Sequence, residues 1–193
     1  HHPVCFTPMK SVTTGDLTGR KFVAMLEHGL SAICMHTNLD AAEGGVNDAL
    51  VSALGARGLG ILNGEDGISR LAELPEEMEF GAFLARTKAA LGANGLRYAG
   101  PMRPVKRIGL CGGAGAGDML LALERGCDTY VTADVKHHEF IAANELGINL
   151  IDGGDFSTED VVVPVLAGWL REDFRGLDVR ISERCTQPER FFV

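Results

Sequence analysis

The second half of the chain alternates between short apolar runs and helical segments, and this alternation restricts the possible folds more than any other feature. The predicted strands are residues 105–111, 129–132, 148–151 and 179–182. The predicted helices are residues 118–125, 138–146 and 158–174. Gly126 and Gly147 follow the first two helices, where glycine commonly ends a helix. Strand, short loop, helix and strand in repetition indicate parallel pairing, so we predict an α/β fold with largely parallel sheets.

The first half of the chain is similar but begins in the middle of the fold, and residues 56–103 form a less regular stretch. Its predicted helices are residues 19–28, 45–54 and 80–91, and its predicted strand is residues 30–35. The proline-rich run Pro101-Met-Arg-Pro104 indicates a joint between two lobes. We therefore predict an N-terminal lobe with an intervening segment in residues 1–103 and a C-terminal α/β lobe in residues 104–193. Because the chain begins with His1 and not with Met, we expect the N-terminal lobe to be truncated, with its first segment missing.

Composition and charge exclude several classes of protein. Hydrophobic residues make up 46% and charged residues 23% of the chain, so it is not a disordered protein. The net charge of −8 argues against direct nucleic-acid binding. The apolar stretch Val161–Leu170 is too short to span a membrane. Five cysteines without a Cys-x-x-Cys pair argue against a zinc knuckle or a disulfide framework, so we expect a cytoplasmic protein.

Imidazoles and carboxylates follow several of the predicted strands. Because ligands of parallel sheets gather at the carboxyl ends of the strands, these side chains are expected at one edge. They are His36, Asp40, Asp134, Lys136, His137, His138, Asp152, Asp155 and Glu159. His1 and His2 would follow a strand that the chain lacks. Imidazoles and carboxylates are metal ligands, so this edge is a candidate metal site.

Each of these residues also has a structural interpretation. Asp155 and Glu159 share one face only if the helix already covers both, and on spacing alone helix capping is the favoured interpretation. His1 and His2 have the appearance of a purification-tag remnant. Asp40 could cap the next helix or order a turn. The group from Lys136 to His138 could be surface residues.

The run Gly112-Gly-Ala-Gly-Ala-Gly117 does not match the standard nucleotide-binding motifs. Asp118 and Met119 stand where a phosphate-binding loop has Lys and Ser or Thr, and the glycine spacing differs from the dinucleotide fingerprint. A close backbone approach and a plain tight turn both remain open. Cys111 ends the preceding strand near a helix start that could lower its pKa, which makes it a weaker candidate nucleophile.

Five segments in this order resemble one family over essentially the whole chain. They are His1-His-Pro-Val-Cys-Phe6, His36-Thr-Asn-Leu-Asp40 with Gly44-Gly-Val-Asn-Asp48, Pro104-Val-Lys-Arg-Ile-Gly-Leu-Cys-Gly-Gly113, Tyr130-Val-Thr-Ala-Asp-Val-Lys-His-His138 and Ile151-Asp-Gly-Gly-Asp-Phe-Ser-Thr-Glu159. The chain resembles the Nif-three-like family, whose members are also called GTP cyclohydrolase I type 2 homologues. The resemblance implies two related α/β lobes, a ring-shaped homohexamer and a pair of divalent metal ions bound between the lobes.

The resemblance also implies a ligand set. His1, His2, Asp40 and Glu159 correspond to the family's metal ligands, and Asp155 stands where the family usually has His. We include Asp155 as a ligand. A carboxylate is a harder ligand than imidazole, so one site should lean from zinc toward manganese, iron or magnesium. The expected cofactors are therefore two divalent ions, drawn from Zn, Mn, Fe and Mg.

The resulting functional prediction is a dinuclear metal-dependent hydrolase acting on a nucleotide or a phosphoester. His138, Asp134 and Lys136 are the candidates for acid–base catalysis or substrate positioning. The alternative is a non-catalytic hexameric metal-binding scaffold or regulatory protein that acts through protein partners. Neither prediction involves a membrane or direct contact with nucleic acid.

Overall fold

A computed structural model describes residues 2–192, and the chain divides into two compact units. Unit 1 ends at Leu39 and unit 2 begins at Asp40. The helix of unit 1 is α1 (Leu17–Glu27), which confirms the helix predicted at 19–28. Its N-cap is Asp16, whose carboxylate accepts a hydrogen bond of 2.7 Å from the Gly19 amide. The short helix α2 (Thr37–Ala41) spans the boundary between the units.

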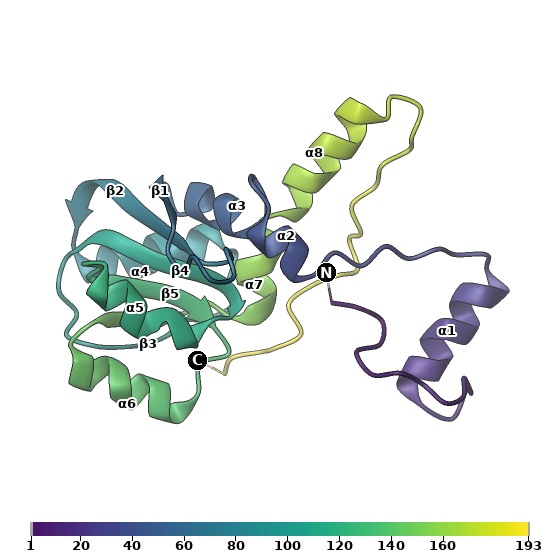
Figure 1. Ribbon diagram of the computed structural model, residues 1–193, viewed down its shortest axis with the longest axis horizontal. Coiled ribbons are helices and arrows are strands. Elements are labelled where there is room, and N and C mark those ends of the chain that lie inside the picture. Colours follow the sequence, from purple (N-terminus) through teal and green to yellow (C-terminus); the bar gives the residue numbers. More distant parts are fainter. Residues whose placement is uncertain (1, 193) are drawn as a thin grey trace. The chain divides into compact units, whose positions relative to one another are not determined.

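Unit 2 contains a six-stranded sheet in the order β1-β2-β4-β5-β6-β3 (Figure 1). Its strands are β1 (Arg57–Ile61), β2 (Arg70–Met78), β3 (Arg97–Ala99), β4 (Val105–Ala114), β5 (Thr129–Ala133) and β6 (Asn149–Asp152). The strands β4, β5 and β6 pair in parallel. The pairs β1–β2, β2–β4 and β3–β6 are antiparallel. The sheet is therefore mixed, with a parallel centre.

Helices cover both faces of this sheet (Figure 1). The further helices of this unit are α3 (Val46–Ala53), α4 (Phe80–Ala90), the 3-10 turn η1 (Ala116–Asp118), α5 (Met119–Glu124), α6 (His137–Leu146), α7 (Asp155–Asp160) and α8 (Val163–Asp173), and of these α8 projects away from the sheet. Leu50 of α3 and Phe83 of α4 are buried against one face. Ala122 of α5 and Ala143 of α6 are buried against the other face. Residues alternate between the two faces along β5, because successive side chains of a strand point to opposite sides.

The prediction of two related lobes with largely parallel sheets is wrong for the described residues. They form one mixed sheet, and its strands come from both sides of position 103, where the sequence predicted a joint. Three strands lie in the stretch that was predicted to be irregular, namely β1, β2 and β3. These strands supply all the antiparallel pairing of the sheet.

Three individual elements also differ from the prediction. The runs 30–35 and 179–182 are not strands. In the first run Leu30 is 61% and Ile33 is 90% exposed, so its apolar pattern does not reflect burial. The helix predicted at 158–174 is two helices, α7 and α8. Pro164 occupies the first turn of α8, where its missing N–H has no helical partner to lose.

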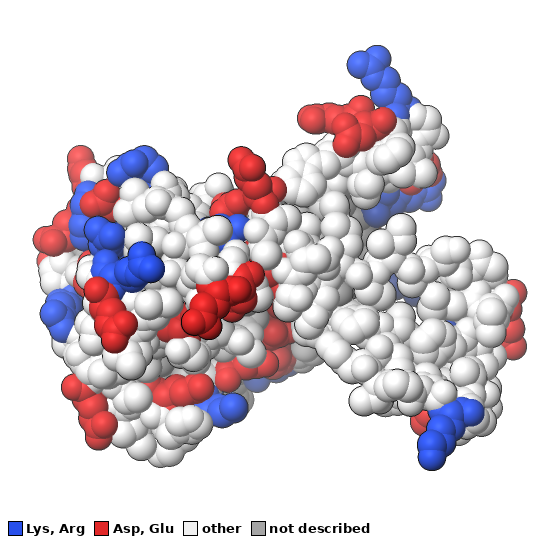
Figure 2. Space-filling view, in the orientation of Figure 1, with Lys and Arg blue, Asp and Glu red and all other residues white. Residues whose placement is uncertain are grey.

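Charge is distributed over the surface without a large basic area in the view of Figure 2, where acidic and basic side chains are interspersed. This distribution agrees with the net charge of −8. Among residues 2–192, the helices lack the combination of length and apolar character that crossing a bilayer requires.

Candidate functional site

The carboxyl ends of the parallel strands β4, β5 and β6 lie at one edge of the sheet, and Asp152 organises the loops there. Asp152 is 4% exposed and ends β6. One carboxylate oxygen accepts a hydrogen bond of 3.0 Å from the Gly154 amide. The other accepts a bond of 3.1 Å from the Val135 amide and pairs with the Arg97 guanidinium. Asp152 therefore ties the loops after β5 and β6 to each other.

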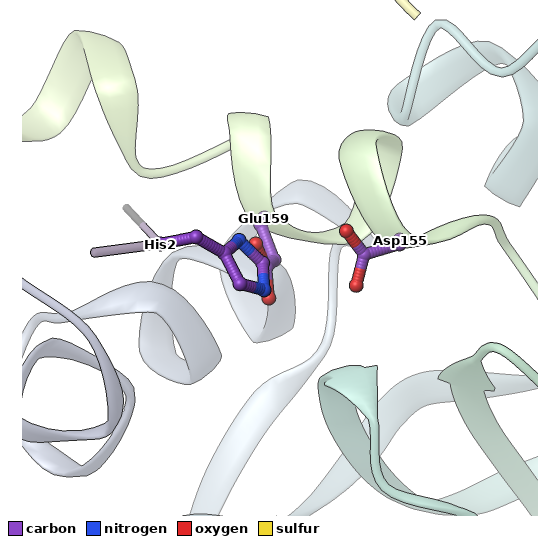
Figure 3. A group of neighbouring side chains, drawn as sticks. All are labelled: His2, Asp155 and Glu159. Atoms are coloured by element: carbon purple, nitrogen blue, oxygen red, sulfur yellow. The ribbon is translucent and has the colours of Figure 1, made fainter. Parts of the chain in front are cut away.

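Asp155 and Glu159 both lie within α7, so they share one face of this helix. The arrangement in which Asp155 precedes the helix is excluded. Both residues are half-buried, and one carboxylate oxygen of each lies within 4.8 Å of the other. Figure 3 shows both side chains projecting from α7 toward the same space. The Thr158 hydroxyl of the same helix accepts a bond of 3.0 Å from the Gly113 amide, which fixes α7 against the end of β4.

Because Gly113 has no side chain, there is room beside it for the carboxylates of Asp155 and Glu159. A Cβ atom at this position would lie 2.5 Å from Glu159 Oε1 and 3.5 Å from Asp155 Oδ1. Gly113 also has a φ of +65°, a conformation that residues with side chains rarely adopt. Of the two interpretations left open for the glycine run, Gly113 is explained by the close backbone approach, and the element it approaches is α7.

Asp40 is buried at 6% exposure and is held near the same strand end through Asn47. The fully buried Asn47 side chain donates a hydrogen bond of 3.2 Å to the Asp40 carbonyl and accepts one of 2.7 Å from the Gly112 amide. The Arg70 guanidinium donates to the Ala41 carbonyl at 3.0 Å. These bonds fix the main chain around Asp40 close to the end of β4.

Cys111 lies beside these carboxylates but is not an activated nucleophile. The pKa of the Cys111 thiol is raised to about 12. Burial is the main cause, and the negative charges of Asp118 and Asp40 contribute less. A thiol with this pKa carries almost no thiolate near neutral pH. The hypothesis of a lowered pKa at Cys111 is therefore wrong.

The three predicted catalytic residues differ in their positions. Asp134 follows β5 with a φ of +51°, an uncommon conformation for a residue with a side chain, and it lines a pocket together with Asp155. Lys136 and His138 are exposed at the start of α6 and do not line that pocket. The Lys136 amide donates a bond of 2.6 Å to the Glu139 carboxylate, which caps α6.

The pocket has a volume of about 310 Å³ and draws its walls from four separate parts of the sequence. Its lining residues are Gly95, Arg97, Asp134, Asp152, Gly154, Asp155, Gln187, Glu189, Arg190 and Phe191. Our sequence analysis did not identify the walls from 95–97 and 187–191. No local motif marks them, because they become neighbours only through the pairing of β3 with β6 and the return of the C-terminal segment.

In unit 1, three rings form an aromatic cluster. The ring centroids of His2 and His36 are 5.2 Å apart, and those of Phe6 and His36 are 5.4 Å apart. Two of the imidazoles that the sequence analysis singled out are thus neighbours within this unit. His1, the other predicted histidine ligand, lies outside the described residues.

The oxygen donors of unit 2 fit a divalent metal ion. Asp155 and Glu159 offer two carboxylates on one helix face, and the position of Gly113 keeps a side chain out of the space next to them. Carboxylate oxygens suit hard ions such as magnesium and manganese. Addition of imidazole ligands would extend this range toward zinc and iron.

Comparisons with known families and proteins cover nearly the whole chain. The model of the family Duf34/NIF3 (NGG1p interacting factor 3) matches residues 1–188. The chain is 35% identical to a "GTP cyclohydrolase 1 type 2 homolog" of Clostridium perfringens over 99% of this chain and 76% of the relative. A protein of the same name from Clostridium acetobutylicum is 30% identical over 99% of this chain and 75% of that protein.

Solved structures show the same fold. A hypothetical protein of Staphylococcus aureus has a TM-score of 0.88 and 26% identity, covering 100% of this chain and 78% of that one. A Bacillus cereus protein related to NIF3 has a TM-score of 0.90 and 22% identity, covering 100% of this chain and 82% of that one. The family match over residues 1–188 and the relatives at 30% identity or more lead to one conclusion. The chain belongs to the DUF34/NIF3 family.

Proposed function

We propose that the protein binds two divalent metal ions and uses them to hydrolyse a nucleotide or a phosphoester. The proposed ligands are His1, His2, Asp40, Asp155 and Glu159. The observation that carries this proposal is the contact between Gly113 and α7, because glycine at this position accommodates the two carboxylates of the helix. Relatives named GTP cyclohydrolase 1 type 2 homolog support a nucleotide as the substrate class.

The roles of the residues follow from their chemistry. Bound divalent ions would lower the pKa of a water molecule and stabilise negative charge in the transition state. Asp134 lines the pocket beside Asp155, so a carboxylate oxygen of Asp134 is placed to accept a proton from a reacting group in that pocket. Lys136 and His138 lie outside the pocket at the exposed start of α6, and we propose that they orient the part of the substrate that extends beyond it.

We also propose that the protein acts as a homohexamer. Several large apolar side chains of unit 1 are exposed, among them Leu17 at 71%, Leu26 at 79% and Ile33 at 90%. Apolar surface of this kind is usually covered by another protein surface. In a homohexamer, neighbouring copies of the chain would cover this apolar surface, so no other kind of protein would be needed.

The metal site is tested by elemental mass spectrometry on wild type, Asp40→Ala and Glu159→Gln after loading with manganese, iron or zinc. We expect about two ions per chain in wild type and a loss of at least half of them in each variant. The matched control is Asp160→Asn, an exposed carboxylate next to Glu159 that should keep the wild-type content. Wild-type protein that binds no metal after loading would contradict the proposal.

The reaction is tested on the same proteins with a panel of nucleotides and phosphoesters. Hydrolysis that requires metal and falls at least 100-fold in Glu159→Gln supports a hydrolase. Two bound ions without turnover of any member of the panel would favour the metal-binding scaffold instead.

A further inference from the structure

The C-terminal segment 187–191 forms one wall of the pocket beside Asp155 and is anchored to the loop before β3. Gln187 is 8% exposed, and its side-chain oxygen accepts a bond of 2.9 Å from the Asn94 amide. The Asn94 side chain in turn donates a bond of 3.0 Å to the Glu189 carbonyl. These two hydrogen bonds join the C-terminal segment to the loop before β3, so the wall is a fixed part of unit 2.

Phe191 provides a flat apolar surface in this wall. A Cβ atom on Gly95 would lie 3.0 to 3.1 Å from Cγ, Cδ1 and Cδ2 of Phe191, so the Gly95 backbone packs against the face of the ring. The Phe191 side chain nevertheless remains 43% exposed and lines the pocket. A ring held on one face and accessible elsewhere is a suitable platform for stacking a planar ligand.

The charges around this platform favour ligands that donate hydrogen bonds. Arg97 is paired with Asp152, and that carboxylate also accepts two backbone amides. Apart from the proposed metal ligand Asp155, the remaining lining charges are the carboxylates of Asp134 and Glu189 against the guanidinium of Arg190. An excess of carboxylates repels a phosphate and accepts hydrogen bonds from N–H and amino groups.

The geometry points to a pocket for a nucleobase or a similar amino-bearing nitrogen heterocycle, stacked on Phe191 and hydrogen-bonded to Asp134. This inference rests on the proposed function and narrows it, because it assigns the base of a nucleotide to the pocket. The pocket volume of about 310 Å³ suits a ligand of this size. It lies at the lower end of the range for small-molecule sites, which is about 300–1,000 Å³.

The test is isothermal titration calorimetry on the full chain after removal of metals with a chelator. Guanosine is the probe, because its base carries a ring N–H and an amino group, and ribose 5-phosphate is the comparison ligand. We expect guanosine to bind and ribose 5-phosphate to bind much more weakly. Phe191→Ala should raise the Kd for guanosine about tenfold, which is the usual cost of removing a stacking ring.

Two further variants make the result specific. Phe192→Ala removes a neighbouring ring that is 106% exposed and does not line the pocket, so it should leave the Kd unchanged. Asp134→Asn keeps a residue that tolerates the left-handed backbone but removes one acceptor charge, so it should weaken guanosine binding. No binding of guanosine, stronger binding of ribose 5-phosphate, or equal Kd values for wild type and Phe191→Ala would overturn the inference.

The inference and the proposed function fail in distinguishable ways. Guanosine binding that depends on Phe191 in a protein without metal or turnover would keep the pocket and reject the hydrolase. Metal-dependent turnover of phosphoesters without guanosine binding would keep the hydrolase and reject the nucleobase pocket.

Discussion

At the scale of single residues, two features of Gly113, its backbone conformation and its closeness to Glu159, are incompatible with any larger residue at this position. Its φ of +65° suits glycine, and its hydrogen atoms face the Glu159 carboxylate at a distance where a methyl group would overlap. The proposed site therefore depends on a residue that contributes no ligand atom. Within the same run Gly115 is also closely approached, by the Cys111 side chain, whereas Gly117 has open space around it.

Gly113→Ala should therefore lower both stability and metal binding. We expect the free energy of unfolding to fall by about 1–3 kcal/mol, because a residue with a side chain is strained at this φ. Metal content should fall as well, since the methyl group displaces Glu159 Oε1. Urea denaturation and elemental analysis measure these two effects. Gly117→Ala is the matched control, and an equal effect of both substitutions would contradict this role for Gly113.

Asn47 should contribute to stability through its two buried hydrogen bonds. Asn47→Ala leaves the Gly112 amide and the Asp40 carbonyl without their side-chain partner. We expect a loss of about 2–3 kcal/mol in urea denaturation, because unsatisfied buried polar groups are costly. Asn144 also makes two side-chain hydrogen bonds but is exposed, so Asn144→Ala should cost less than about 1 kcal/mol. Similar losses in the two variants would show that burial at Asn47 does not matter.

The buried thiols should make the protein less stable at high pH. Burial raises the pKa of Cys111 to about 12 and that of Cys127 to about 11, from an ordinary value of 9.0. Above pH 9 the unfolded chain loses these protons while the folded chain keeps them, so the free energy of unfolding falls as pH rises. Each thiol can contribute up to about 1.4 kcal/mol per pH unit over this range.

Urea denaturation between pH 8 and pH 10.5 measures this slope. Cys111→Ala should reduce the slope relative to wild type. The exposed Cys34 is the control, and Cys34→Ala should retain the wild-type slope. A pH dependence that is unchanged in Cys111→Ala would reject the assignment to this thiol.

At the scale of elements, the sequence predicts helices better than strands. The helices α1, α3, α4 and α6 are each predicted to within a few residues, because helical spacing and glycine stops are local signals. The strand β1 is the run Arg57-Gly-Leu-Gly-Ile61, and β2 contains Pro75 and two consecutive glutamates. Neither run has the composition of a strand, and they form one because they pair with each other and with β4.

The same distinction applies to the candidate site. Asp155 and Glu159 are candidates already from the sequence, although their spacing alone favours helix capping and only the family resemblance makes them ligands. The space next to them depends on Gly113 and the walls of the pocket on residues 95–97 and 187–191. These parts become neighbours because β3 pairs with β6 and because the C-terminal segment packs back against the loop before β3. No local sequence pattern predicts either of these long-range contacts.

Arg70 joins several elements of unit 2 and should be important for its stability. Its guanidinium is 7% exposed, pairs with Asp48 at 2.7 Å, and donates to carbonyls of the hairpin loop and of the turn after α2. We expect Arg70→Ala to lower the free energy of unfolding by about 3 kcal/mol, because it leaves these partners unpaired. Arg57 pairs with Glu73 but is 72% exposed, so Arg57→Ala should cost less than about 1 kcal/mol. Chemical denaturation of the two variants compares these costs, and equal costs would contradict this interpretation.

At the scale of the whole molecule, the division after Leu39 separates the proposed ligands into two groups. The carboxylates Asp40, Asp155 and Glu159 and the pocket belong to unit 2, whereas His2 belongs to unit 1. The carboxylates among the proposed ligands are all positioned by unit 2. Membership of the DUF34/NIF3 family covers both units, since the match extends over residues 1–188.

The most direct test of this account is anomalous diffraction from crystals of the full chain grown with manganese. We predict anomalous peaks beside the carboxylates of Asp155 and Glu159, at the face of α7 that approaches Gly113. In Glu159→Gln crystals these peaks should weaken strongly or disappear. Manganese found only elsewhere in the wild-type protein, or peaks that are unchanged in the variant, would contradict a metal centre built on α7.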